Sequence, residues 1–369
     1  MDVKCLVMYG MAVGDRRTPL TVDVHTHCFP AGLGDLAATT GDDRWPSLDV
    51  RDDGSSRIMR GRDVFRPVAA SCWNSAARLE AMDRAGVDVQ VLSPVPIMMT
   101  NWAEPSLAAD FARRLNEGLA AVASTAPDRY RWLGAVPLQD TDAAIAELHR
   151  ATAELGMSGV QIGTEIAGRE LDDPSLRPFF AAAADLGVAI FVHPTDGGAI
   201  RRKGAPFEFG LGMLTDTALA ASALLFGGVL DDCPQLRVGL AHGCGSFPWA
   251  FPRLARGATM APGGPGYSAR MAHSEELLSR LWADTLVFDS HHLALLMTRF
   301  GAEQLFLGSD FPFYPPEWGG PTDVIDDARR RGWCDDAQAD AMKGANGFRF
   351  LGIDPATVLL SSTASATVS

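Results

Sequence analysis

The feature that most constrains the fold is an alternation of short β-branched runs with longer Ala- and Leu-rich segments. The β-branched runs predict strands at residues 21–24, 87–92, 131–136, 159–162, 188–192, 236–241, 281–285 and 304–307. Segments with helical periodicity lie between them, at residues 76–85, 106–126, 142–155, 175–186, 215–230 and 293–300. Eight strands alternating with helices favour a (β/α)8 TIM barrel over a doubly wound sheet.

One long segment interrupts this alternation after the first strand. Residues 30–74 are rich in Gly, Asp and Arg, and apolar and polar residues alternate at 56–60 and 63–66. Such alternation predicts a small β-hairpin, and a long insertion in a compact domain is usually functional. We therefore expect an inserted β-subdomain that covers the mouth of the barrel.

Composition places limits on the location and partners of the chain. We expect an N-terminal extension over residues 1–20, a barrel over 21–352 and a disordered tail over 353–369. The extension lacks the pattern of a signal peptide, and the six cysteines have no paired spacing, which predicts a cytoplasmic protein. A net charge of −13 argues against nucleic acid or an anionic membrane as a partner. We also expect no membrane span, because no run of about 18 apolar residues is present.

Polar side chains end several of the predicted strands. His25 and His27 end the first strand, and because they are two residues apart they point to the same face. His193 ends the run Ala-Ile-Phe-Val, His242 ends Val-Gly-Leu-Ala, and Asp310 ends Leu-Phe-Leu-Gly-Ser. In a (β/α)8 barrel the carboxyl ends of the strands surround the active site. The five side chains are therefore predicted to meet there.

The residue types point to a metal centre. Three imidazoles and one carboxylate suit Zn(II), with Mn(II) or Fe(II) as alternatives, so we assign His25, His27, His193 and Asp310 as ligands. Asp310 thereby also belongs to the catalytic set. His242 is assigned as the acid/base beside the metal; the alternative is a further ligand in a two-metal site. No lysine follows residues 159–162 in a position to bridge two metals, which favours a single ion.

Two arginines are candidates for binding an acidic substrate. Arg66 lies in the insertion, in Val-Phe-Arg-Pro-Val, and Arg253 follows His242 by eleven residues. Guanidinium groups bind carboxylates with two parallel hydrogen bonds. A surface ion pair is the alternative for each of them.

Seven motifs together resemble the metal-dependent decarboxylase branch of the amidohydrolase superfamily, over residues 21–352. They are His-Thr-His, Phe-Arg-Pro-Val, Met-Asp-Arg-Ala-Gly-Val-Asp-Val-Gln-Val-Leu-Ser, Gly-Val-Gln-Ile-Gly-Thr, Phe-Val-His-Pro, Ala-His-Gly-Cys-Gly-Ser-Phe-Pro and Leu-Gly-Ser-Asp-Phe-Pro-Phe. The resemblance implies a single-zinc barrel that acts as a homodimer. It supports the ligand set, His242 as the acid/base and Arg66 as a carboxylate-binding residue. It also implies that Arg253 reaches the active site of the neighbouring subunit.

The chain departs from this family in residues expected to form the pocket wall. Thr195 follows His193-Pro194 where the family has Trp, residues 205–211 replace a Trp-containing stretch, and Cys244 stands within a Gly-Gly-Gly motif. Cys244 either contacts metal or substrate or is a small buried residue. These departures leave the metal and proton-transfer residues intact, so they concern the choice of substrate.

The sequence thus predicts a metal-dependent, non-oxidative carboxy-lyase for a small carboxylated, conjugated or aromatic acid. The first alternative is a hydrolase of a lactone or amide that uses the same site. The second is a non-catalytic sensing or scaffold protein, which the complete ligand set disfavours.

Overall fold

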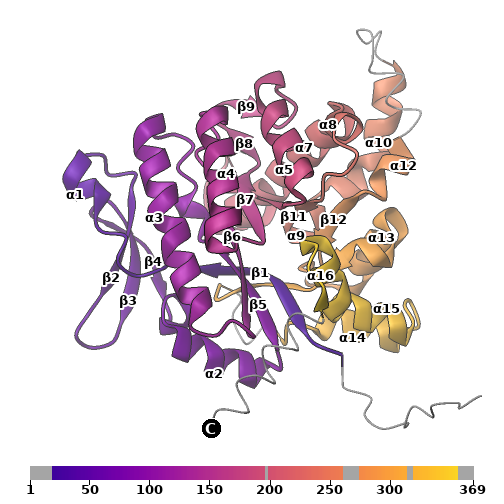
Figure 1. The fold of residues 1–369 in the computed structure, drawn as a ribbon. Helices are drawn as coiled ribbons and strands as arrows, with labels where there is room; N and C mark the ends of the chain where they lie inside the picture. The colour runs from indigo at the N-terminus through magenta and orange to yellow at the C-terminus, as the bar shows by residue number, and fades with distance from the viewer. Residues whose placement is uncertain (1–18, 196–197, 261–273, 314–318, 356–369) are drawn as a thin grey trace, which may run out of the picture.

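The computed structural model describes residues 19–195, 198–260, 274–313 and 319–355. The predicted extension and tail lie almost entirely outside these residues. Within them, parallel strands alternate with helices around a barrel (Figure 1). The strands are β1 Val22–Cys28, β5 Val89–Pro94, β6 Tyr130–Gly134, β7 Gly159–Gly163, β10 Ala189–His193, β11 Val238–Leu240, β12 Leu281–Asp284, β13 Leu305–Phe306 and β14 Gly308–Phe311.

The eighth strand of the barrel is formed by two short pieces that close the sheet. β13 pairs with β12, and β14 pairs with β1. Between the two pieces, the carbonyl of Leu307 accepts a hydrogen bond of 2.9 Å from the Val24 amide. The strand order β13-β12-β11-β10-β7-β6-β5-β1-β14 therefore returns to its starting point. The predicted (β/α)8 barrel is confirmed.

Helices cover the outside of the barrel. The longer ones are α2 Ser75–Ala85, α3 Pro105–Ser124, α4 Thr141–Leu155, α5 Arg177–Leu186, α7 Met213–Phe226, α10 Phe247–Met260 and α13 Ser290–Phe300. The shorter ones are α6 Ala205–Phe207, α8 Val229–Asp232, α12 Ser274–Leu278, α14 Asp323–Arg330, α15 Asp336–Asp340 and α16 Asn346–Leu351. The segment α9 Ala241–Cys244 is a turn after β11, because His242 and Gly243 have left-handed φ and ψ. The predicted helix at 215–230 is wrong in its bounds, because Gly228 adopts a left-handed conformation (φ 85°) that separates α7 from α8.

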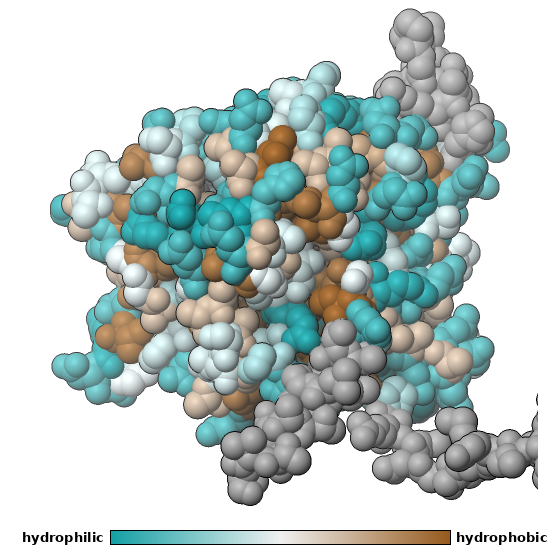
Figure 2. Space-filling model, in the orientation of Figure 1, coloured by the Kyte–Doolittle hydropathy of each residue, from teal (hydrophilic) through white to brown (hydrophobic). Residues whose placement is uncertain are grey.

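One helical segment, Ala205–Phe226, is long and apolar enough to cross a membrane, with a mean hydropathy of 1.5. The sequence alone predicts no such segment, because it has no run of about 18 apolar residues. Half of the segment's most apolar window is buried inside the protein, and the core helix of a barrel meets the same criterion. This segment is therefore weak support for a membrane span. The face shown in Figure 2 is largely hydrophilic, with apolar residues in small separate groups.

Apolar side chains fill the inside of the barrel and position the site above them. Val22, Val24 and Phe191 belong to this inner cluster, and Phe348 and Phe350 of α16 contribute to it from the C-terminal end of the chain. The pairing of β1 shifts register against both neighbours between Asp23 and Thr26. Because of this shift, His25 lies on the inner side above Phe191, with ring centroids 5.0 Å apart.

The insertion after β1 contains a three-stranded antiparallel sheet and a short helix. Its elements are α1 Leu36–Thr40, β2 Pro46–Val50, β3 Ser56–Arg60 and β4 Asp63–Val68. The inserted β-subdomain is confirmed, although only the hairpin β3–β4 was predicted and β2 was not. Trp45 attaches the insertion to the barrel, because its ring packs on Trp102 and Phe111 at 5.0 and 5.3 Å. Figure 1 shows the sheet beside α3. A second small sheet pairs β8 Glu165–Ile166 with β9 Arg169–Glu170.

Candidate metal centre

The four predicted ligands lie together at the carboxyl ends of the strands. His25 and His27 come from β1, His193 from β10 and Asp310 from β14, and one atom of each lies within 4.8 Å of all the others. The Nε2 atoms of His25 and His27 are 3.2 Å apart. Asp310 Oδ1 is 3.0 Å from the Nε2 of His27 and 3.5 Å from that of His25. All three histidines are buried, and the Asp310 side chain is 14% exposed.

Each histidine binds an oxygen through Nδ1 and leaves Nε2 for the centre of the group. The acceptors are Asp284 Oδ2 for His25 at 2.6 Å, the Pro94 carbonyl for His27 at 2.9 Å and the Pro194 carbonyl for His193 at 2.6 Å. Metal-ligating histidines use the second ring nitrogen in this way. Nε2 of His193 is buried and has no hydrogen-bond partner among the described residues. A buried nitrogen without a partner, beside two imidazoles and a carboxylate, fits a metal ion.

The electrostatics of the group keep two of its members, His193 and Asp310, in the forms that bind metal. Burial lowers the pKa of His193 well below its usual value, and the neighbouring histidines lower it further. Burial alone would raise the pKa of Asp310, but the hydrogen bond and charge of His27 bring it down to about 2. A neutral imidazole and an ionised carboxylate are the forms that coordinate a cation.

His242 lies beside the metal group without belonging to it. Its ring centroid is 5.0 Å from that of His193 and 5.4 Å from that of His25. Burial lowers the pKa of His242 to about 4, with a further contribution from His25. Its Nδ1 atom is buried and has no hydrogen-bond partner in the described part of the chain. This position suits a group that exchanges a proton with a bound molecule rather than a structural histidine.

Two residues that support the centre were not predicted. Asp284 ends β12 and binds His25, and it follows the apolar run Leu-Trp-Ala, the same signal that identified the ligands. Arg78 of α2 is almost fully buried and donates to the carbonyl of His27 and, at 2.9 Å, to Gln90 Oε1. Arg78 therefore fixes the end of β1 from the outside of the barrel. Its position within a helical segment gave no signal for this role.

The structure places the two candidate arginines differently. The Arg66 guanidinium lies over the ring of Phe313, 4.8 Å from its centroid, and Phe313 lies 5.7 Å from His27. Arg66 thus reaches the mouth beside the metal group. Arg253 is exposed on α10 and does not belong to the metal group of its own chain.

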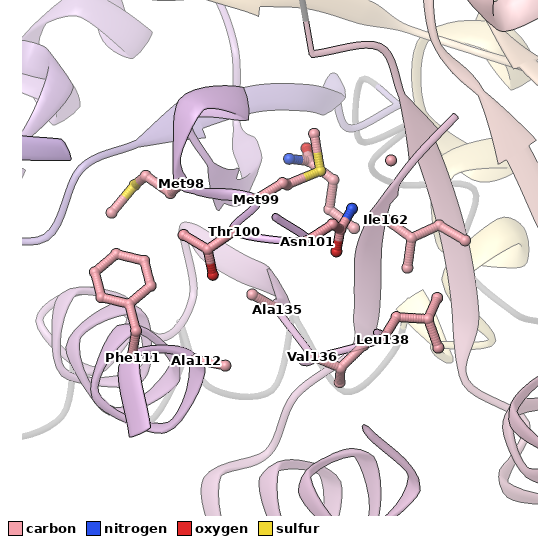
Figure 3. Close-up of a pocket in the computed structure, with 12 residues that line it drawn as sticks. Met98, Met99, Thr100, Asn101, Phe111, Ala112, Ala135, Val136, Leu138 and Ile162 are labelled. Carbon is pink, nitrogen blue, oxygen red and sulfur yellow. The ribbon is translucent and has the colours of Figure 1, made fainter. Parts of the chain in front are cut away.

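Two cavities open at the mouth. The larger, about 890 Å³, has His242 in its wall and is otherwise mostly apolar, with Phe209, Trp249 and Phe288 among its lining residues. The smaller, about 390 Å³, contains Thr195 and is more polar, with Arg44 and Arg60 in its wall. A third space, bounded by Thr100, Asn101 and Val136 in Figure 3, holds only about 10 Å³. That volume fits roughly one water, so this space is not a substrate site.

Cys244 and Phe207, which also lie where the chain departs from the family motifs, have different surroundings. Cys244 is completely buried among apolar side chains and is not part of the metal group. Burial raises the pKa of its thiol well above the usual value. Of the two alternatives for Cys244, the structure therefore favours the small buried residue. Phe207 lies under the guanidinium of Arg202, 3.9 Å from its ring centroid.

The fold and the site define a metal-dependent (β/α)8-barrel protein. The amidohydrolase family model matches residues 22–353. The chain is 36% identical over 337 residues to the 2-amino-3-carboxymuconate-6-semialdehyde decarboxylase of Dictyostelium discoideum, covering 91% of this chain and 92% of that protein. This chain therefore belongs to the amidohydrolase family.

Solved structures share the fold. IDCase from Metarhizium anisopliae, in its apo form, superposes with a TM-score of 0.74 at 23% identity, covering 90% of this chain and 97% of that chain. A dihydroxybenzoic acid decarboxylase from Polaromonas sp. JS666, with bound manganese and the inhibitor 2-nitroresorcinol, superposes with a TM-score of 0.69 at 20% identity. It covers 90% of this chain and 97% of that chain.

Proposed function

We propose that this protein is a metal-dependent carboxy-lyase that removes carbon dioxide from a small carboxylated, conjugated or aromatic acid. The observation that carries the proposal is the buried group His25, His27, His193 and Asp310 with His242 beside it, in a chain 36% identical to a named decarboxylase. The substrate is 2-amino-3-carboxymuconate 6-semialdehyde or a related acid. Dihydroxybenzoates are the other acids to test, because a protein of the same fold is named for them.

Each residue of the site has a separate role in the proposed reaction. Arg66 binds a carboxylate of the substrate at the mouth. When bound, the metal supplies a Lewis acid for the polar groups of the substrate. The bond between carbon and the departing carboxylate breaks, and its electron pair remains on the substrate carbon, where the conjugated system delocalises it. His242 relays a proton from solvent to that carbon to form the new C–H bond, and carbon dioxide leaves.

The metal of this site is Zn(II), with Mn(II) or Fe(II) as the alternatives. Three imidazoles and one carboxylate are common ligands of zinc, and the same donors accept the other two ions. The fold neighbour with bound manganese supports keeping Mn(II) in the comparison. Elemental analysis of the purified protein, followed by removal and stepwise return of each ion, distinguishes the three.

The function is tested by incubating the metallated protein with a panel of carboxymuconate semialdehydes and hydroxybenzoates. Release of carbon dioxide with a matching loss of mass from the acid is the expected result. A lactone or amide opened without loss of carbon dioxide would instead establish the hydrolase. A preparation that holds no metal and turns over neither class would establish a non-catalytic protein.

Replacing Arg66 with Ala is expected to raise KM about 10- to 100-fold with a smaller change in kcat. The reason is that a hydrogen bond to a charged group contributes about 1.5–3 kcal/mol, and 1.4 kcal/mol corresponds to a factor of ten. Steady-state kinetics on the best acid of the panel measures this effect. Arg62→Ala, a neighbouring exposed arginine on the turn between β3 and β4, is the matched control. Equal kcat/KM for the two variants would contradict the role of Arg66.

The active unit in this proposal is a homodimer in which Arg253 completes the neighbouring active site. Trp249 and Arg253 are four residues apart, so they lie on one face of α10, and Trp249 is 77% exposed. Trp249, Phe209 and Phe288 also line the apolar cavity beside His242. A second copy on this face would cover these apolar side chains and bring its Arg253 toward His242. Exposed apolar surface of this kind marks interaction sites.

Arg253→Ala and His193→Ala are each expected to be inactive, and a mixture of the two should regain roughly a quarter of the activity when chains pair at random. In a mixed dimer, one site has both an intact metal group and an intact Arg253 from the partner. Activity after co-refolding or co-expression measures this recovery. No recovery, with mixed dimers shown by mass spectrometry, would rule out sharing of Arg253.

The remaining expectations concern location and partners. The five cysteines that the structure describes are buried and unpaired, which supports a reducing compartment, the cytoplasm. The net charge of −13 supports a protein that binds neither nucleic acid nor an anionic membrane.

A further inference from the structure

A buried carboxylate connects the metal group to the turn that carries His242. Asp284 has no exposed surface. Its Oδ2 accepts from His25 Nδ1 at 2.6 Å and from the His242 amide at 2.8 Å. Its Oδ1 accepts from the amide of Gly243 at 2.8 Å and from that of Leu286 at 3.1 Å. Each carboxylate oxygen therefore accepts two hydrogen bonds. One of the two comes from the backbone amide of His242 or of Gly243.

The turn after β11 has a conformation that needs such support. Four successive residues, 242–245, have positive φ, and His242 (φ 57°) and Cys244 (φ 65°) are not glycines. Left-handed backbone is unfavourable for residues with a Cβ and persists only where the surroundings hold it. Successive amides of this kind converge to form a small anion-binding concavity. The carboxylate of Asp284 occupies that concavity and so holds the backbone from which the His242 ring projects.

The same carboxylate sets the orientation of a metal ligand. The Nδ1–H of His25 donates to Asp284, which turns Nε2 toward His27 and Asp310. The side chains of His25 and Asp284 are closely packed against β14, because a Cβ on Gly308 would lie 2.7 Å from the Cβ atoms of both residues. His25 and His242 are thus placed by one group that touches neither cavity at the mouth.

We propose that Asp284 is a positioning residue that couples the geometry of the metal centre to that of the proton-donating histidine. The inference rests on the proposed function in so far as His242 is the proton donor; the link between Asp284 and the metal ligand does not depend on it. An isosteric amide cannot take this place. Asn offers one acceptor oxygen, and its NH2 group would face two further N–H donors.

The test uses Asp284→Asn in the full-length protein with two measurements. The Kd for Zn(II) or Co(II), by competition with a chelator and without substrate, is expected to rise about 10- to 100-fold. The visible spectrum of the Co(II) protein should change with it. At saturating metal and substrate, kcat is expected to stay about 100-fold below wild type with little change in KM, because the His242 ring is displaced.

Two further variants separate the effect on the turn that carries His242 from the effect on the metal and from a general loss of stability. Gly243→Ala is aimed at the turn and keeps the Asp284 carboxylate, and its Cβ would lie 2.3 Å from Val287 Cγ1; it should lower kcat and leave the metal Kd unchanged. It also tests the turn if Asp284→Asn does not fold. Glu147→Gln removes another buried carboxylate, which binds Asn116 and Arg150 between α3 and α4. It should lower Tm while leaving metal Kd, the Co(II) spectrum and kcat unchanged.

The outcomes distinguish the alternatives. Asp284→Asn with a normal metal Kd and a normal kcat would overturn the proposal. A kcat that returns to the wild-type value once metal is saturating would restrict Asp284 to His25 and overturn the coupling. If no acid is decarboxylated by the wild type, the proposed function fails, while the metal Kd and the Co(II) spectrum still decide the role of Asp284 at the metal.

Discussion

His242→Asn is expected to lower kcat by about 10²- to 10⁴-fold, the usual contribution of a positioned acid or base, while the metal content stays at the wild-type level. Asn is the substitution of choice because it tolerates the left-handed backbone of residue 242 (φ 57°). An Ala there would lack the short polar side chain that lets Asn adopt this conformation, so it would confuse loss of a proton donor with loss of structure. Steady-state kinetics and elemental analysis measure the two quantities.

The control for this variant is His291→Asn. His291 lies at the start of α13 with an exposed side chain and is hydrogen-bonded to Asp289. It should keep both metal and turnover. An unchanged kcat in His242→Asn would remove His242 from the reaction, and a loss of metal would indicate that it is a further ligand, the two-metal alternative.

Asp310→Asn is expected to abolish both metal binding and turnover. The carboxylate is the one anionic group among the four ligands, and its pKa of about 2 shows how strongly the surrounding imidazoles favour its charge. A neutral amide of the same shape also tolerates the left-handed backbone of residue 310 (φ 59°). The metal Kd should rise by more than about 100-fold, beyond the effect of changing a residue that only supports a ligand.

This second prediction is checked by metal content and by chelator competition, with Asp289→Asn as the control. Asp289 is an aspartate at the mouth that caps α13 and lines the larger cavity. Its substitution should leave the metal Kd unchanged. A metallated, active Asp310→Asn protein would contradict the assigned ligand set. His242→Asn and Asp310→Asn also differ from each other, because only Asp310→Asn should lose the metal.

The order of strands and the metal group could be predicted because each signal is local. His193, His242 and Asp310 each follow an apolar run that is long enough to identify a strand end. Strand ends in a closed barrel converge whatever the details of packing. The residues therefore meet without any knowledge of the helices between them.

Other features depend on contacts between distant segments and could not be predicted. The register shift in β1 appears only when its pairing with β5 and β14 is known. β2 pairs with β3 from Pro46↔Arg60 to Val50↔Ser56, yet its Pro and Asp disfavour a strand when judged alone. Asp284 ends a strand like the ligands, but its role depends on backbone amides of a turn about forty residues away in the sequence.

The two-piece eighth strand has a consequence for how the protein matures. The ribosome makes His25 early and Asp310 late, and the pairing of Ser309 with Asp23 spans 286 residues. A nascent chain therefore has only part of its ligand set until β14 has emerged and docked beside β1. A chain can therefore acquire the ion only late in biogenesis, after β14 has paired with β1. A product truncated before β14 would be unable to retain the ion.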